Sequence, residues 1–165
     1  MISVRTAQIQ DIAGISHLLA TSWKTAYRGI VDDDYLDSLG YDHWVDYLTS
    51  ALSGDTVFSM VLSENQEIVG ASVLGKSETE NEVHLISLYL LPEKIGLGYG
   101  HKFYGEIEKE IRNKGFKKCA LDVLEKNKRA VKFYKAHGFT DTRVEAVTVL
   151  GNRNYPYKVF EKTLS

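Results

Sequence analysis

The segment from Ser87 to Gly100 constrains the fold most, because its pattern predicts a strand, a glycine-rich turn and a helix start. A short apolar run comes first, and Pro92 ends it because proline cannot donate a hydrogen bond within a sheet. Alternating glycines then allow a sharp bend with exposed N–H groups: Gly96, Gly98 and Gly100. Apolar residues spaced as on one helix face follow: Phe103, Ile107 and Ile111. Exposed N–H groups at a helix start predict an anion-binding site, suited to a phosphate-bearing cofactor.

A plain tight turn would explain the same glycines, and two sharper glycine motifs do not fit them. The dinucleotide-binding motif needs glycines in a G-x-G-x-x-G frame. That frame requires a glycine at His101 when counted from Gly96, or at Phe103 when counted from Gly98. The triphosphate-binding loop requires Gly-Lys followed by Ser or Thr, which this turn lacks. The turn therefore argues against a nucleotide-dependent enzyme of either class.

Length and composition indicate one domain over residues 1–165 with a sizeable apolar core. The chain is 44% hydrophobic and 25% charged, and no apolar run approaches the ~20 residues of a membrane span. The N-terminus lacks the basic head and long apolar region of a signal peptide. The single cysteine, Cys119, lies in an apolar strand pattern, so a buried thiol and a reducing cytoplasm are expected. Five scattered histidines show no metal-ligand spacing, so neither a metal nor a membrane is an expected partner.

Charge is distributed unevenly along the chain, although the net charge is only −2. Residues 1–83 carry four basic and 13 acidic side chains, whereas residues 84–165 carry 16 basic and nine acidic ones. A basic second half suits an anionic ligand and an acidic first half suits a cationic one, although both could be solvated surfaces. The basic residues are not interleaved with aromatic residues in a recognisable motif, so nucleic acid is not an expected partner.

Hydrophobic periodicity predicts a mixed α/β or α+β sheet covered by helices. Strands are expected at residues 2–6, 56–63, 67–75, 82–91, 118–123, 139–150 and 155–164. Helices are expected from the N-cap Asp11 to about Tyr27, at residues 32–39, 42–52 and 99–113, and after the N-cap Asn127. The last two strands should form a hairpin that turns through residues 151–154.

A second motif follows the glycine turn, and the two together resemble a known family. The second block has the pattern N-x-x-A-x-x-F-Y-x-x-x-G-F and is matched at Asn127, Ala130, Phe133, Tyr134, Gly138 and Phe139. The first block, Q/R-x-x-G-x-G/A after a strand and a proline, is matched at Ile95, Gly98 and Gly100. In this order and at this interval, the blocks resemble the GNAT superfamily of acetyl-CoA-dependent N-acetyltransferases. Ile95 departs from the pattern, since it stands where that family usually has Gln or Arg, and Lys94 is a candidate to replace the charge.

The resemblance implies a mixed, mostly antiparallel central sheet of about seven strands, flanked by helices. Two of its strands, at about 82–91 and 118–123, would splay apart to admit acetyl-CoA. Acceptor-side helices would occupy residues 10–52, the acetyl-CoA-binding core residues 82–139, and a C-terminal hairpin residues 139–164. The implied acetyl-CoA contacts are Leu88, Tyr89, Leu90, Ile95, Gly96, Leu97, Gly98, Tyr99, Gly100, His101, Asn127, Ala130, Phe133 and Tyr134.

The resemblance also implies direct attack of a primary amine on the acetyl thioester. Tyr134 matches the family's general acid by its place in the Phe-Tyr pair. Glu82 and His84 share one face of a strand, and either could accept the proton of the amine, as could water. A strand bulge near Ser87 would change which side chains face the site.

The acceptor is expected to be a small cationic amine, bound near Trp23, Tyr27 and Asp32. Each of these has a structural explanation as well, because aromatic residues four apart often pack in a core and acids often cap helices. Two alternatives stay open: a protein or peptide N-acetyltransferase, and a coenzyme A-binding module without catalysis. A homodimer through the exposed final hairpin is a further expectation.

Overall fold

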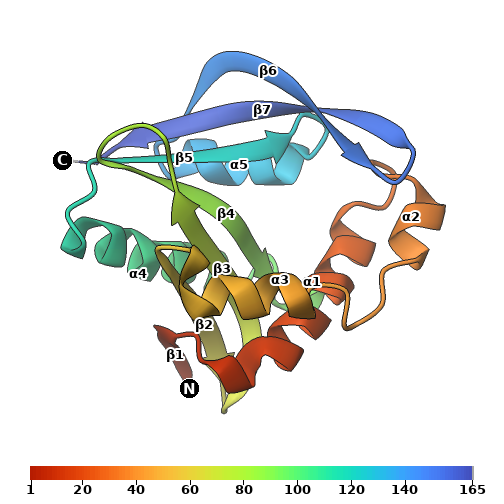
Figure 1. Ribbon diagram of the computed structural model, residues 1–165, viewed down its shortest axis with the longest axis horizontal. Helices are drawn as coiled ribbons and strands as arrows, with labels where there is room; N and C mark the ends of the chain where they lie inside the picture. Colours follow the sequence, from red (N-terminus) through yellow and green to blue (C-terminus); the bar gives the residue numbers. More distant parts are fainter. Residues whose placement is uncertain (165) are drawn as a thin grey trace.

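The structure, a computed structural model that describes residues 1–164, is built on one seven-stranded sheet (Figure 1). The strands follow the spatial order β1-β2-β3-β4-β5-β7-β6. Their bounds are Ile2–Thr6 (β1), Phe58–Glu64 (β2), Glu67–Lys76 (β3), Glu82–Leu90 (β4), Lys118–Leu124 (β5), Thr140–Leu150 (β6) and Arg153–Thr163 (β7). All neighbours are antiparallel except β4 and β5, which are parallel. The predicted mixed, mostly antiparallel sheet is confirmed.

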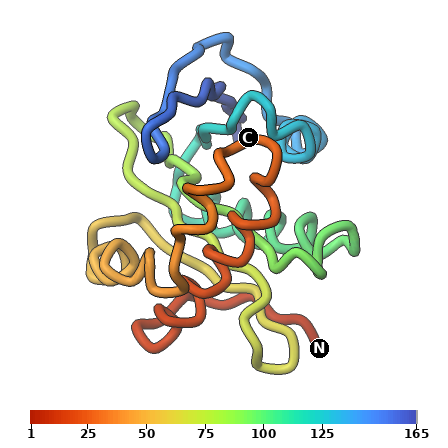
Figure 2. The backbone as a smooth tube through the Cα atoms, turned by 90° about the vertical axis from the view of Figure 1, so that its right-hand side faces the viewer, coloured from red at the N-terminus to blue at the C-terminus, as the bar shows by residue number. Residues whose placement is uncertain are grey.

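Helices cover both faces of this sheet. α1 (Ile12–Ala26) and α3 (Val45–Ser50) pack on one face, against β2 and β3. α4 (Tyr99–Asn113) and α5 (Lys128–Ala136) pack on the other, and Figure 2 shows α3 and α4 on opposite sides of the sheet. The short helix α2 (Asp33–Asp37) lies beside the tip of the β6–β7 hairpin (Figure 1). Shorter helical turns complete the chain at Ile9–Asp11, Ala51–Asp55 and Pro92–Lys94.

The largest apolar cluster lies between α4 and the central strands. Phe103, Ile107 and Ile111 are completely buried there, as their spacing along the helix predicts. They pack with buried residues of the strands, among them Leu121 and Phe160. Burial of one such side chain contributes about 1.5–3 kcal/mol. This cluster therefore holds in place the helix whose N-terminus carries the glycine turn.

β4 and β5 pair over a short stretch and then separate. Their register runs from Glu82 opposite Lys118 to Leu85 opposite Leu121 and ends there. At the same point the register of β4 against β3 shifts, because Ile86 is inserted between the paired residues Leu85 and Ser87. This bulge changes the side-chain alternation of β4 just before the strands part. Both the splayed strand pair and the bulge near Ser87 are confirmed.

The start of α1 differs in its chemistry from the prediction. Asp11 occupies the N-cap position, but its side chain makes no capping bond to α1. Its carboxylate instead accepts hydrogen bonds from the Arg5 guanidinium, at 2.7 and 3.0 Å, and from the Gln8 N–H at 2.8 Å. The bond from Arg5 holds the pKa of Asp11 below its usual value. Asp11 thus ties α1 to strand β1 rather than capping the helix.

The described residues contain neither a helix suited to span a membrane nor a cluster of metal ligands. Nowhere in residues 1–164 does a helix combine the length and apolar character needed to cross a membrane. Over the same residues, no group of three or more His, Cys, Asp or Glu side chains could hold a metal ion. Two histidines do meet, since ring nitrogens of His101 and His137 lie 2.7 Å apart.

Cys119 is fully buried in β5, as its apolar surroundings in the sequence predict. Burial raises the pKa of its thiol to about 12. Because the thiolate is the reactive form, we expect the native protein to react very slowly with a thiol reagent such as DTNB at pH 8. The unfolded protein should release one equivalent of chromophore per chain at once. Rapid reaction of the native protein would contradict the buried position of Cys119.

Candidate active site

A cavity of about 340 Å³ lies where β4 and β5 separate. We call it the central cavity, and its lining residues come from α1, β4, β5, α5 and the final hairpin. They are Trp23, Tyr27, Leu85, Ile86, Leu88, Tyr89, Asp122, Val123, Leu124, Asn127, Ala130, Tyr134, Thr148 and Tyr157. Apolar and aromatic walls with a few polar groups are typical of small-molecule sites. Seven residues predicted from the sequence meet here, from segments far apart in the chain.

Three aromatic side chains form one wall of the central cavity. Trp23 and Tyr27 come from the end of α1, and their rings meet edge to face with centroids 4.7 Å apart. Tyr89 joins them from β4, and its hydroxyl lies 2.9 Å from that of Tyr27. Burial raises the pKa of both tyrosines above its usual value, so both hydroxyls stay protonated in the neutral range. This wall is aromatic and uncharged.

The opposite wall comes from α5. The Asn127 side chain caps this helix by accepting a hydrogen bond from the Ala130 N–H at 3.3 Å, which confirms the predicted N-cap. Tyr134 lies on the face of α5 that lines the cavity. Burial raises the pKa of its hydroxyl above the usual tyrosine value. Tyr134 therefore presents a protonated hydroxyl to the cavity over the whole physiological range of pH.

The glycine turn has the backbone conformation of an anion cradle. Gly96 and Gly98 have backbone φ values of 83° and 85°, which residues other than glycine rarely adopt. A Cβ atom at either position would meet no atom within 4 Å, so the space over the turn is open. At Gly100 a Cβ would lie 3.1 Å from the Phe133 ring, because α4 and α5 pack closely. The turn can accept a phosphate group through its backbone at the N-terminus of α4.

The side chains of the turn offer an anion fewer free positive charges and hydrogen-bond donors than the sequence suggests. Lys94 forms an ion pair of 2.8 Å with Glu64 rather than supplying a free charge in place of the usual residue at Ile95. The Tyr99 hydroxyl also donates to Glu64, at 3.0 Å. His101 turns towards His137, and Leu97 is exposed. The groups that the turn itself leaves for an anion are therefore mainly its backbone N–H groups.

The two predicted base candidates occupy different positions. The Glu82 carboxylate accepts a hydrogen bond from Ser77 at 2.7 Å and lies 3.8 Å from Lys118. It does not line the central cavity. His84 does not line the central cavity either, but its Nε2 lies 3.6 Å from Oδ2 of Asp122, which does. The structure thus connects His84, and not Glu82, to the central cavity.

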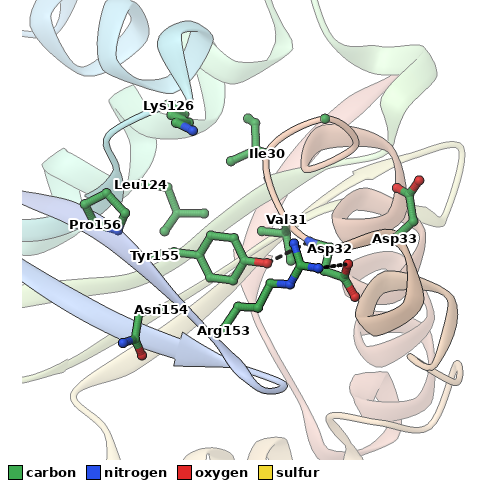
Figure 3. A pocket seen from close by; sticks show the side chains of 11 residues that line it. Ile30, Val31, Asp32, Asp33, Leu124, Lys126, Arg153, Asn154, Tyr155 and Pro156 are labelled. Carbon is green, nitrogen blue, oxygen red and sulfur yellow. Dashed lines mark hydrogen bonds and ion pairs between the residues drawn. The ribbon is translucent and has the colours of Figure 1, made fainter.

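A second cavity, of about 440 Å³, adjoins the central cavity at Leu124, which lines both. This outer cavity lies between the turn after α1 and the start of β7 (Figure 3). Asp32, predicted to bind substrate, lines the outer cavity rather than the central one. Its N–H donates to the Tyr155 hydroxyl at 2.8 Å, and its carboxylate lies 3.6 Å from the Arg153 guanidinium.

The family model described as the acetyltransferase (GNAT) family matches residues 17–139, which is more than half of the chain. This chain belongs to that family. The matched segment contains the splayed strands, the glycine turn and the α5 motif. Transfer of an acetyl group is therefore the general activity of this acetyltransferase.

Individual relatives agree with this assignment. YuaI, an uncharacterized N-acetyltransferase of Bacillus subtilis strain 168, is 30% identical over 141 residues, or 83% of this chain and 79% of that protein. The spermidine N(1)-acetyltransferase of Thermoplasma acidophilum is 28% identical over 149 residues, or 84% and 88%. The PaiA N-acetyltransferase of T. acidophilum, solved with coenzyme A, has a TM-score of 0.81 and 23% identity over 99% of both chains. The last comparison shows a shared fold.

Sequence reasoning missed several cavity residues, most importantly Asp122. A signal was present, because Asp122 is a lone acid in the apolar run of β5, where it lies exposed between the buried residues Leu121 and Val123. Thr148 and Tyr157 were also missed, since their place in the cavity depends on how the hairpin packs beside β5. No local pattern marks them.

Gly98, the N-cap of α4, and Gly105, within that helix, offer a matched test of the turn. We expect Gly98→Ala to lower the free energy of unfolding by about 1–2 kcal/mol, because its φ of 85° disfavours a side chain. It should also weaken coenzyme A binding, measured by calorimetry, since the cradle would distort. The control Gly105→Ala lies in the middle of the helix with open space around it and should stabilise by about 0.5–1 kcal/mol. Equal coenzyme A affinities of the two variants would exclude the turn from the binding site.

Proposed function

We propose that this acetyltransferase moves the acetyl group of acetyl-CoA to the primary amine of a small cationic molecule. The observation that carries the proposal is the central cavity, where Tyr134 and Asp122 line one space at the separation of β4 and β5. The glycine turn at the start of α4 packs through Gly100 against Phe133 of α5, the helix that also lines this cavity. The spermidine acetyltransferase relative supports a small amine as acceptor.

The backbone of β4 and the glycine turn suit the elongated, phosphate-bearing donor. Acetyl-CoA supplies an acetyl thioester, whose C–S bond breaks as the amine forms the new C–N bond. Beyond Leu85, β4 has lost β5 as a partner, so the backbone of Leu88 can pair with amide groups of the donor as an added strand would. The Leu90 carbonyl is already bound by the Ser22 hydroxyl at 2.5 Å. Gly96 to His101 would hold the pyrophosphate by N–H groups.

Tyr134 is placed to stabilise the departing sulfur. The reference pKa of a tyrosine, about 10, exceeds that of a thiol, about 8.5, so complete transfer of its proton to a free thiolate is unfavourable. Burial increases this difference. Tyr134 therefore acts best as a hydrogen-bond donor to the negative charge as it develops, a contact that low polarity strengthens.

The amine must lose a proton before it can attack, and Asp122 with His84 is the best-placed acceptor. Asp122 reaches the central cavity, and His84 lies behind it on the neighbouring strand. The Nε2 atom of His84 lies 3.6 Å from the Asp122 carboxylate, so His84 can take a proton that Asp122 first attracts. We propose this pair as the base, through direct contact or one water molecule.

Replacing Tyr134 tests the hydrogen-bond role. Tyr134→Phe should lower kcat by about 10²-fold, while the dissociation constant of coenzyme A stays near the wild-type value. Steady-state kinetics and calorimetry measure the two quantities. Tyr104→Phe removes a hydroxyl that lines neither cavity and serves as the control. An unchanged kcat in Tyr134→Phe would remove this residue from the mechanism.

Replacing Asp122 tests the base. Asp122→Asn should lower kcat/KM for an amine acceptor by about 10²-fold at pH 7. The deficit should shrink as pH rises towards 10, since more of the amine is then already deprotonated. Glu125→Gln, outside both cavities, is the control. A deficit that does not vary with pH would mean that Asp122 only positions the amine.

The proposed function itself is tested with acetyl-CoA and a panel of amines that includes polyamines and peptides. Mass detection of an acetylated small amine would support it, with release of the coenzyme A thiol in equal amount. Acetylation of peptides alone would favour a protein acceptor. Saturable coenzyme A binding without transfer to any amine would indicate a binding module instead.

A further inference from the structure

The outer cavity carries a defined set of charges. Asp32, Asp33, Lys126 and Arg153 are its charged lining residues. Figure 3 shows the Asp32 carboxylate turned towards Arg153. The Asp33 carboxylate is turned away from Asp32 and Arg153 (Figure 3). Asp33 is bound outside by Arg28, at 3.1 Å. The groups that face the cavity are therefore one carboxylate and two cations.

These charges differ from what a polyamine requires. A purely cationic acceptor would need free carboxylates, but the acidic run at residues 32–34 offers fewer than its composition suggests. Arg28 binds both Asp33 and Asp37, and Arg153 lies beside Asp32. Within residues 1–164, Lys126 makes no ion pair. A ligand with at least one anionic group would match the excess of positive charge.

The pair of Asp32 and Arg153 is also suited to exchange partners with a ligand. Its charged atoms are 3.6 Å apart, and the Arg153 side chain is 70% exposed, so the pair is weak. The Tyr155 hydroxyl accepts from the Asp32 N–H, which leaves its own hydrogen free to donate towards the cavity. A carboxylate could thus meet Arg153, Lys126 and Tyr155, while an ammonium group meets Asp32.

The outer cavity continues directly from the central one. Leu124 lines both cavities. On β7, Tyr155 of the outer cavity is two residues from Tyr157 of the central cavity. After α1, Gly29 of the outer cavity follows Tyr27 of the central cavity by two residues. Two residues of a strand span about 7 Å. A short carbon chain could therefore join a group in the outer cavity to an amine beside Tyr134.

We propose that the outer cavity binds the zwitterionic α-amino-acid end of the acceptor, whose side-chain amine is acetylated in the central cavity. This inference rests on the proposed function and narrows its substrate class from small cationic amines to diamino acids. The α-carboxylate pairs with Arg153 and Lys126, and the α-ammonium group pairs with Asp32.

Matched acceptors separate this proposal from a preference for polyamines. L-Lysine and L-ornithine carry the whole zwitterion, cadaverine and putrescine lack its carboxylate, and 6-aminohexanoate lacks its α-ammonium group. We expect kcat/KM for lysine or ornithine to exceed that for the matching diamine by about tenfold or more. Equal or higher values for cadaverine, putrescine or spermidine would overturn the proposal.

Variants of the outer cavity locate the effect. Arg153→Met and Lys126→Met should each reduce the ratio of lysine to cadaverine activity by about tenfold, since one contact to the carboxylate is lost. Arg143→Met removes the same charge from the same hairpin, outside both cavities, and should leave the ratio unchanged. An unchanged ratio in both cavity variants would overturn the proposal.

A binding measurement distinguishes failure of this inference from failure of the proposed function. Lysine and cadaverine are titrated calorimetrically into the full chain saturated with coenzyme A. If no amine is acetylated, the proposed function fails, but saturable lysine binding that Arg153→Met weakens still supports the outer cavity as a zwitterion site. Absence of lysine binding, or equal binding of cadaverine, overturns it.

Discussion

The early end of the pairing between β4 and β5 is the constraint on which the site depends. The strands share a register from Glu82 to Leu85, and at Ile86 a bulge turns β4 away. The bulge sends Tyr89 to the face occupied by α1, where its hydroxyl meets that of Tyr27. The separation also leaves room for Tyr134 to line the cavity from α5. One inserted residue thus produces the open strand edge and the aromatic wall together.

The charges available to a ligand in this protein depend on local ion pairs rather than on the net charge of each half of the chain. The acidic first half suggests an attraction for amines, yet Arg28 binds Asp33 and Asp37 there. In the second half, Lys94 binds Glu64, so it adds no free charge near the glycine turn. The exposed pairs of Arg28 contribute little to stability, about 0–1 kcal/mol each. Their main effect is to decide which charges remain available to a ligand.

Much of the fold could be predicted because its signals are local. The glycine turn, the apolar spacing of α4 and the Asn127 cap each depend on residues a few positions apart. The family motifs combine such signals, so they also indicated the splayed strands and, with the aromatic end of α1, half of the residues that line the central cavity. The capping role of Asp11 was wrong, because Arg5 on the preceding strand binds its carboxylate more directly.

By itself the sequence determined the order of elements and the two motifs, since short-range periodicity and backbone freedom encode both. Only the tertiary structure decided the chemical partners within the site. His84 meets Asp122 from a neighbouring strand, and the Tyr155 hydroxyl meets the Asp32 N–H across 123 positions of sequence. The glycine-rich turn and the helix start after it were recognisable from the residues alone. That Lys94 and Tyr99 are both bound to Glu64, so that neither is free for a ligand, followed from packing against β2.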